Sequence, residues 1–203
     1  LTLQQRTHEE DVFDAETASL ITHILADPAA RRLEFGAGGL LLFPMRVAAS
    51  TVLLEKATPE ALLPAIARHR PTVLFTAPTS YRVMAAHGPA LRQTRLRQCV
   101  SAGEALPAAT RTLWREATGI ELIDGIGATE LLHIFISADE AHARPGATGK
   151  AVPGYVVELR DETGHVLTGS EEVGDLYIGG PSSALMYWNN REKSNDTFRG
   201  AWT

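Results

Sequence analysis

The sequence contains a single cysteine, no apolar run of membrane-spanning length and no surplus of basic residues. Because Cys99 is the only thiol, no internal disulfide can form, which is typical of proteins from a reducing compartment. The longest strongly apolar stretch, residues 38–44, is far shorter than the ~20 residues of a membrane-spanning helix. The chain carries 19 Lys and Arg against 24 Asp and Glu, whereas nucleic-acid-binding faces are strongly basic. We therefore expect a cytoplasmic protein that binds neither nucleic acid nor a membrane.

The composition supplies ample material for a folded core. Hydrophobic residues make up 44% of the 203 positions and charged residues 21%, which excludes global disorder. The length fits one large domain, or one domain and part of another.

Short β-branched runs alternate with amphipathic segments after residue 46. The pattern predicts strands at 47–54, 71–75, 97–101 and 120–123, and helices at 58–69, 80–86 and 107–117. Before it, apolar residues on one face predict a helix at 15–26. This order favours the α/β class, with a mainly parallel sheet flanked by helices. Alternating segments at 155–160 and 174–178, with a turn at 162–164, predict part of a small antiparallel, barrel-like β element. We therefore divide the chain into an N-terminal segment (1–32), an α/β subdomain (33–149) and a partial β-barrel subdomain (150–203).

Three segments carry residues suited to ligand binding. Ligands of open parallel sheets bind at the carboxyl ends of the strands. The loop at 101–107 is rich in small residues, and the loop at 124–130 combines two glycines with Thr129 and Glu130. The third segment, 174–180, ends in Gly-Gly. Taken singly, the second loop is also compatible with a tight structural turn, and the third segment with an ordinary strand.

In order and spacing, these segments resemble three core motifs of the adenylate-forming enzymes, the acyl-CoA synthetase or AMP-binding superfamily. The resemblance covers residues 33–203 and is nearest to the benzoate- and 2-aminobenzoate-CoA ligase branch. Segments 41–47 (LLFPMRV), 75–79 (FTAPT) and 124–136 (DGIGATELLHIFI) carry that branch assignment.

The resemblance implies a role for individual residues. Asp124 would recognise adenine, with Gly125, Ile126 and Gly127 beside the ring and Gly103 and Glu104 flanking it. Thr129 would bind the α-phosphate and Glu130 would hold Mg²⁺, which makes these two the catalytic candidates. The aryl-acid pocket would be formed by Phe35, Gly36, Ala102, Gly127 and His133. His133 also has a simpler interpretation, as a packed histidine on an apolar strand at 131–136.

The implied function is that of an acid–thiol ligase using ATP, Mg²⁺ and CoA. Such an enzyme converts an aromatic carboxylate into an acyl-adenylate and then into a CoA thioester. The family's Lys-containing phosphate loop is absent from residues 1–32, and its mobile C-terminal domain with a catalytic Lys would follow Thr203. We therefore expect a fragment with little turnover alone.

Two other interpretations stay open. One is a nucleotide-binding or structural fragment without chemistry of its own. The other is an amino-acid adenylation domain, although such domains usually have an aromatic residue where this chain has Ile126. The sequence leaves the particular aryl acid and the oligomeric state undetermined.

Overall fold

The computed structural model describes residues 38–139 and 141–203, which lie within the unit Glu34–Thr203. The helix predicted at 15–26 and the pocket candidates Phe35 and Gly36 lie outside the described residues.

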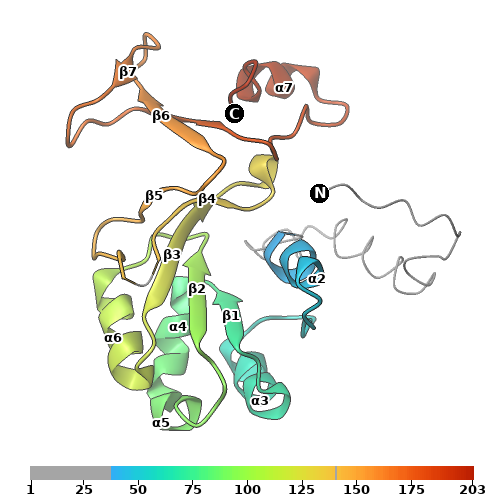
Figure 1. The fold of residues 1–203 in the computed structure, drawn as a ribbon, viewed down its shortest axis with the longest axis vertical. Helices are drawn as coiled ribbons and strands as arrows, with labels where there is room; N and C mark the ends of the chain where they lie inside the picture. Colours follow the sequence, from blue (N-terminus) through green and yellow to red (C-terminus); the bar gives the residue numbers. More distant parts are fainter. Residues whose placement is uncertain (1–37, 140) are drawn as a thin grey trace, which may run out of the picture. The chain divides into compact units, whose positions relative to one another are not determined.

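A five-stranded sheet with the strand order β1-β2-β3-β4-β5 forms the centre of the fold (Figure 1). Its strands are β1 (Val73–Thr76), β2 (Gln98–Ala102), β3 (Leu122–Gly127), β4 (Ile134–Ser137) and β5 (Lys150–Ala151). Strands β1, β2 and β3 are parallel, whereas β4 and β5 continue the sheet in antiparallel pairing. The predicted α/β class is confirmed, and the sheet is mixed. The connection from β3 to β4 is too short for a parallel crossover, which requires a dozen or more residues.

One helix precedes the parallel strands and the others join them, close to the helices that the sequence predicts at 58–69, 80–86 and 107–117. They are α3 (Pro59–His69), α4 (Pro78–Met84), η3 (Ala85–His87), α5 (Gly88–Leu91) and α6 (Ala108–Thr118). Helix α3 has Pro59 in its first turn and ends at Arg70, which adopts the left-handed conformation. Helix α6 ends at Gly119, whose φ of 82° is readily adopted only by glycine.

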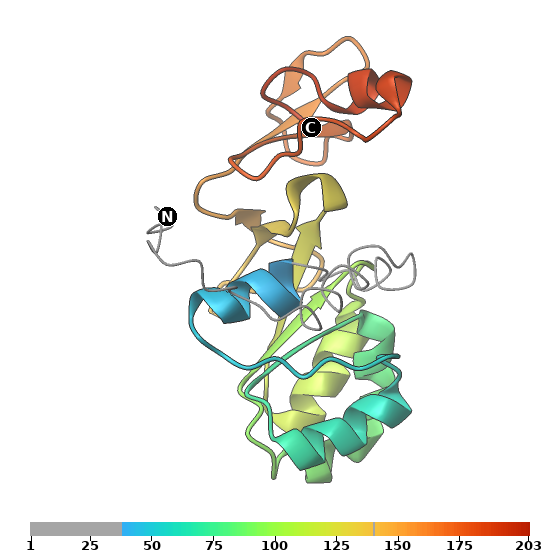
Figure 2. The same cartoon turned by 90° about the vertical axis from the view of Figure 1, so that its right-hand side faces the viewer.

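The helices pack on one face of the parallel strands and enclose the main hydrophobic core (Figure 2). Tyr81 on α4 and Trp114 on α6 are fully buried, and their rings meet edge to face at 4.8 Å. The Tyr81 hydroxyl lies 2.9 Å from the Leu74 carbonyl oxygen and 3.0 Å from that of Val100. Tyr81 thereby links α4 to the strand β1 and to its neighbour β2.

The strand predicted at 47–54 is wrong. The preceding residues form η2 (Gly38–Leu42) and α2 (Phe43–Arg46), and residues 47–54 have no strand structure. The amides of Val47 and Ala49 bond back to the Pro44 carbonyl, and Ala48 has a φ of 53°. This turn interrupts the extended run, and none of the strands in the described ranges pairs with residues 47–54. Val47 is 72% exposed.

A second, three-stranded sheet has the order β7-β6-β8 and is antiparallel, as predicted. It consists of β6 (Val156–Arg160), β7 (Val166–Leu167) and β8 (Asp175–Gly179), and α7 (Arg191–Thr197) follows it. Within the described part of the chain, this sheet does not close into a barrel.

None of the helices among residues 38–139 and 141–203 has the length and apolar character needed to cross a membrane.

Candidate active site

Buried polar side chains cross the first three strands at one level. Thr76, Ser101 and Asp124 are register partners on β1, β2 and β3, and they are 6%, 0% and 9% exposed. Register partners on adjacent strands point to the same face of the sheet. Because polar groups are costly to bury without a function or a partner, this polar row marks the carboxyl edge of the sheet as the candidate site.

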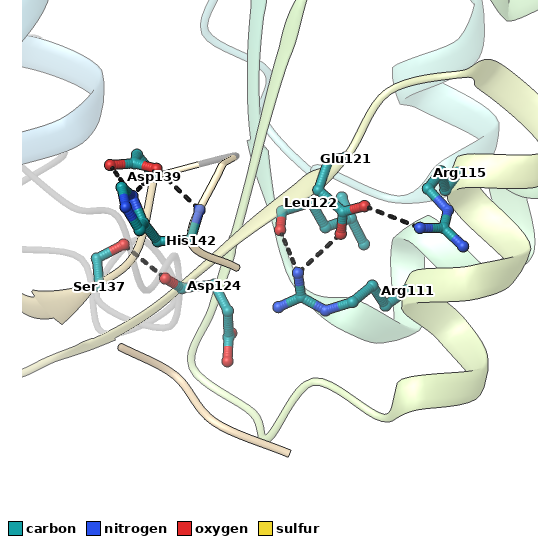
Figure 3. Close-up of polar contacts among 8 residues, drawn as sticks. All are labelled: Arg111, Arg115, Glu121, Leu122, Asp124, Ser137, Asp139 and His142. Carbon is teal, nitrogen blue, oxygen red and sulfur yellow. Dashed lines mark hydrogen bonds and ion pairs between the residues drawn. The ribbon is translucent and has the colours of Figure 1, made fainter. Parts of the chain in front are cut away.

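Asp124 is the titratable member of this row. Burial raises the pKa of its carboxyl group above the ordinary value, because the charged form loses solvation. A hydrogen bond from the Thr148 side chain, one from the Gly125 amide and the charge of Arg111 act in the opposite direction. Ser137 Oγ also donates to the Asp124 backbone carbonyl at 2.6 Å, which joins β4 to β3 (Figure 3).

The start of β3 is anchored to helix α6 by Arg111, which is 6% exposed. Its Nη1 donates to Glu121 Oε1 at 2.8 Å and to the Leu122 carbonyl at 3.0 Å (Figure 3). Because Asp124 follows Leu122 closely in the same strand, this anchor also positions the Asp124 carboxyl group.

The end of β3 requires glycine because β4 packs against it. A Cβ on Gly125 would lie 2.6 Å from Ile134 Cδ1, and a Cβ on Gly127 would lie 2.9 Å from the His133 carbonyl oxygen. The two-glycine loop pattern predicts that these glycines admit a ligand. The structure gives them a second reason, which is the close packing of the β3–β4 pair.

Strand β2 and the loop after it bring one aryl-pocket candidate, Ala102, and two adenine-site candidates, Gly103 and Glu104, to the same edge. Ala102 is the register partner of Gly125 and is 2% exposed. Gly103, with a φ of 86°, and Glu104 follow it as exposed residues. Ile126 on β3 is 40% exposed, so its aliphatic side chain is available for apolar contact.

The two catalytic candidates lie in the short helix η4 (Thr129–Leu131) between β3 and β4. Thr129 is exposed and Glu130 is half-buried. Glu130 Oε1 accepts a hydrogen bond from the Tyr187 hydroxyl, and the Glu130 backbone carbonyl accepts one from the Ala184 amide at 2.7 Å. Burial and the hydrogen bond to Glu130 raise the pKa of Tyr187. The segment that follows β8 therefore holds η4 in place.

His133 precedes strand β4, so the prediction that it lies within a strand at 131–136 is wrong. Leu132 has a φ of 72°, and this left-handed residue separates η4 from β4. The half-buried His133 ring meets the rings of Phe43 and Tyr155 edge to face, each at 5.2 Å. Its Nε2 lies 2.7 Å from the Tyr155 hydroxyl, and its Nδ1 lies 2.5 Å from the Ile134 carbonyl oxygen.

Three site neighbours were not found by sequence reasoning, namely Tyr155, Ser182 and Tyr187. Their hydrogen bonds join residues that are 22 to 57 positions apart. One signal was present: Gly180 needs to be glycine, because a Cβ there would lie 2.2 Å from Tyr155 Cδ1. The Gly-Gly pair at 179–180 thus marks the packing of Tyr155, which spacing alone does not identify.

Most of the candidate residues share the carboxyl edge of the sheet. Ala102, Gly103 and Glu104 end or follow β2, beside Asp124, Gly125, Ile126 and Gly127 on β3, and Thr129, Glu130 and His133 belong to the β3–β4 connection. In the described ranges, no group of three or more His, Cys, Asp or Glu side chains could hold a metal ion.

The fold and site thus define an α/β protein with its candidate ligand site at the carboxyl edge of a mixed sheet. The chain belongs to the family of AMP-binding enzymes, whose model matches residues 33–188.

Relatives with known activities include aryl-CoA ligases. The chain is 45% identical over 172 residues to a benzoate–CoA ligase of Thauera aromatica. This aligned region covers 83% of this chain and 33% of that protein. It resembles the structure of a benzoate CoA ligase from Burkholderia xenovorans LB400 with a TM-score of 0.78 and 47% identity, over 84% of this chain and 35% of that one. The structure of the anthranilate CoA ligase AuaEII in complex with anthranoyl-AMP gives a TM-score of 0.77 and 44% identity, over 84% and 33% of the two chains. The chain therefore spans about a third of the length of these proteins.

Proposed function

We propose that this chain carries the adenylate- and aryl-binding part of an ATP-dependent aryl-CoA ligase that acts on benzoate or 2-aminobenzoate. The observation that carries the proposal is the position of His133. Its backbone packs against Gly127 at the end of β3, beside the strand whose last residue is Ala102. Three of the five residues expected to form an aryl pocket thus belong to one edge of the sheet. The similarity to an enzyme bound to anthranoyl-AMP supports an aryl-adenylate as the ligand class.

The proposed reaction has two steps. The aryl carboxylate attacks the α-phosphorus of ATP, which forms the aryl-adenylate and releases pyrophosphate. The CoA thiol then attacks the acyl carbon, which releases AMP and gives the thioester. Asp124 would bind adenine, and the adenine ring would lie between the Gly103–Glu104 turn and the Gly125–Gly127 strand end. Thr129 would orient the α-phosphate.

Glu130 is suited to hold Mg²⁺. It is a carboxylate beside the exposed Thr129, and Tyr187 orients one of its oxygens. Mg²⁺ is commonly held by one or two carboxylates together with substrate phosphates, so a single protein ligand suffices. When bound there, Mg²⁺ would supply positive charge that offsets the charge of the phosphates.

We further propose that the chain binds ligands better than it turns them over. The chain spans about a third of the length of the similar ligases. By the family resemblance, the phosphate loop and a catalytic Lys would be supplied by segments other than residues 33–203. We expect the activity in the cytoplasm, because ATP and CoA are available there and the single cysteine fits a reducing compartment.

Calorimetric titration with AMP tests the adenylate site. Replacing Asp124 with Ala is expected to weaken AMP binding about tenfold, because one hydrogen bond to the ligand is lost. The matched control is Asp139→Ala, since Asp139 is exposed and bonds to His142 (Figure 3). If the parent chain does not bind AMP, the adenylate-binding function is wrong and a structural role remains.

An ATP–pyrophosphate exchange assay with benzoate and with 2-aminobenzoate tests the expected low turnover. Exchange near background is expected for the chain alone. Robust exchange would contradict the assignment of essential groups to segments outside this chain.

A further inference from the structure

A chain of hydrogen-bonding groups runs from the β3–β4 connection to two residues that flank the strands of the small sheet, Tyr155 and Ser182, and back. His133 Nδ1 lies 2.5 Å from the Ile134 carbonyl, and Nε2 lies 2.7 Å from the Tyr155 hydroxyl. The Tyr155 hydroxyl contacts Ser182 Oγ, which donates to the Leu131 carbonyl at 2.6 Å. We call these four contacts the His133 network.

Both ends of the His133 network are backbone carbonyls, which can only accept a hydrogen bond. Nδ1 must therefore carry a proton toward Ile134, and Ser182 must direct its hydroxyl proton to Leu131. Ser182 Oγ is then the acceptor for the Tyr155 proton. The Tyr155 oxygen has no second proton to offer, so the proton between it and His133 must come from Nε2.

The number of protons decides the charge of the ring. Four contacts need four protons, whereas a neutral imidazole, a phenol and a serine hydroxyl supply three. We infer that the His133 network holds His133 as an imidazolium, with Tyr155 and Ser182 as the residues that favour this charged form. A neutral ring would leave one of the four close contacts without a proton.

In the part of the chain that the structure describes, the charge of this imidazolium has no ion-pair partner. The ring contacts are with Phe43 of α2 and with Tyr155. The charged residues on α2 and η4 are Arg46 and Glu130, and the Glu130 carboxylate accepts its hydrogen bond from Tyr187. On β6, which follows Tyr155, Glu158 and Arg160 pair with each other.

This inference rests on the proposed function for its consequence. If His133 lines the aryl pocket, a fixed positive charge there favours an aryl carboxylate over a neutral analogue of the same shape. Benzoate and benzamide form such a pair, since they differ chiefly in charge. Tyr155 and Ser182 would then act on specificity through His133 without contacting the substrate.

Side-chain ¹⁵N–¹H correlation spectra of the chain at pH 7 test the charge directly, because the nitrogen shifts of an imidazolium differ from those of a neutral ring. His133→Gln identifies the His133 signals by their loss. In the parent chain, we expect both ring nitrogens of His133 to be protonated. A neutral His133 in the parent chain would overturn the inference.

Ser182→Ala is the sharpest variant. It leaves two contacts, from Nδ1 to Ile134 and from Tyr155 to Nε2, and a neutral ring plus the phenol supply both protons. His133 is therefore expected to become neutral, protonated on Nδ1. Ser182→Thr keeps the hydroxyl and should retain the imidazolium. If Ser182→Ala keeps a folded spectrum and His133 stays doubly protonated, the network does not set the charge.

Ligand titrations separate this inference from the proposed function. Benzoate binding is expected to weaken about tenfold in Ser182→Ala, because the carboxylate loses the attraction of the imidazolium charge, whereas binding of the uncharged benzamide should not change. An imidazolium in a chain that does not bind benzoate would support the charge assignment and refute the aryl-acid assignment. Benzoate binding to a chain with neutral His133 would support the aryl-acid assignment and refute the charge assignment.

Discussion

The α/β region, residues 58–127, and the small-sheet region, residues 155–203, differ in where their large side chains lie. In the α/β region, Tyr81, Met84 and Trp114 are fully buried. In the small-sheet region, Leu185 is 87% exposed and Trp188 is 94% exposed. Ile178, at 2% exposed, is the buried hydrophobic residue there.

This difference shows that the two regions are stabilised by different interactions. The α/β region is held by apolar burial, which contributes about 25 cal/mol for each Å² removed from water. The small-sheet region relies more on polar and ring contacts. Arg160 lies over the Tyr177 ring at 4.4 Å and over the Trp202 ring at 4.9 Å, and Tyr187 bonds to Glu130 of η4. At the candidate site, a polar contact from the small-sheet region, the bond from Tyr187 to Glu130, reaches the η4 helix that follows the α/β region.

The largest effect is expected for Trp114→Ala. It should lower the free energy of unfolding by about 3–5 kcal/mol, because it removes a fully buried indole from the core. The matched control is Trp188→Ala, which should change this free energy by less than about 0.5 kcal/mol, since Trp188 is 94% exposed. Urea unfolding of both variants measures the contrast. Equal losses would show that the two regions do not differ in the way described.

Gly180→Ala is expected to lower the free energy of unfolding by a smaller amount, about 1–3 kcal/mol. The new Cβ would lie 2.2 Å from Tyr155 Cδ1, so the Tyr155 ring must move. Gly164→Ala serves as the control, because its site is open and only the φ of 86° opposes the change, at about 1 kcal/mol. Urea unfolding compares the two. A cost for Gly180→Ala no greater than that of the control would mean that the Tyr155 ring is loosely held.

Tyr187→Phe tests the bond between the small-sheet region and η4. The loss of the hydrogen bond to Glu130 should cost about 0.5–1.5 kcal/mol in the free energy of unfolding. Tyr177→Phe is the matched control, since the Tyr177 hydroxyl accepts an exposed hydrogen bond from Arg199 Nη1 at 2.9 Å. We expect the control to cost less. If Tyr187→Phe leaves the free energy of unfolding unchanged, η4 does not depend on this bond.

The smallest effect is a pH dependence from Asp124, within the polar row of the α/β region. Because its pKa is raised in the folded state, its stabilising contribution is complete below the ordinary value of 3.8 and is lost as the pH rises through the folded value. The stability of Asp124→Asn relative to the parent chain should therefore increase as the pH rises from about 4 toward neutrality, and then level off. Urea unfolding at several pH values measures this difference. A difference that stays constant or falls with pH would contradict the assigned effect of burial.

Much of the α/β region was predictable because its signals are local. The helix at 59–69 follows from Thr58-Pro59-Glu60 and an apolar stripe, and α6 ends at Gly119. The segment 47–54 was not predictable in the same way. Its apolar residues resemble a strand, but a strand needs a neighbour for its backbone groups, and local sequence does not supply one.

The candidate site likewise contains residues that the local sequence identifies and residues whose positions depend on tertiary structure. The motif residues at 101–104 and 124–130 were identified from the sequence, and the parallel register of β2 and β3 brings Ala102 beside Gly125. The position of His133 was predicted less well, because a left-handed Leu132 places it before β4 instead of within a strand.

Residue order alone determined the α/β class, the principal helices and the motifs that carry the family resemblance, because periodicity, caps and spacing are properties of neighbouring residues. Tertiary structure decided which groups meet Glu130 and His133. Tyr187 is 57 positions from Glu130, and Tyr155 is 22 positions from His133. Contacts at such separations depend on how the small sheet packs against the β3–β4 connection, and that packing also sets the proton count of the His133 network.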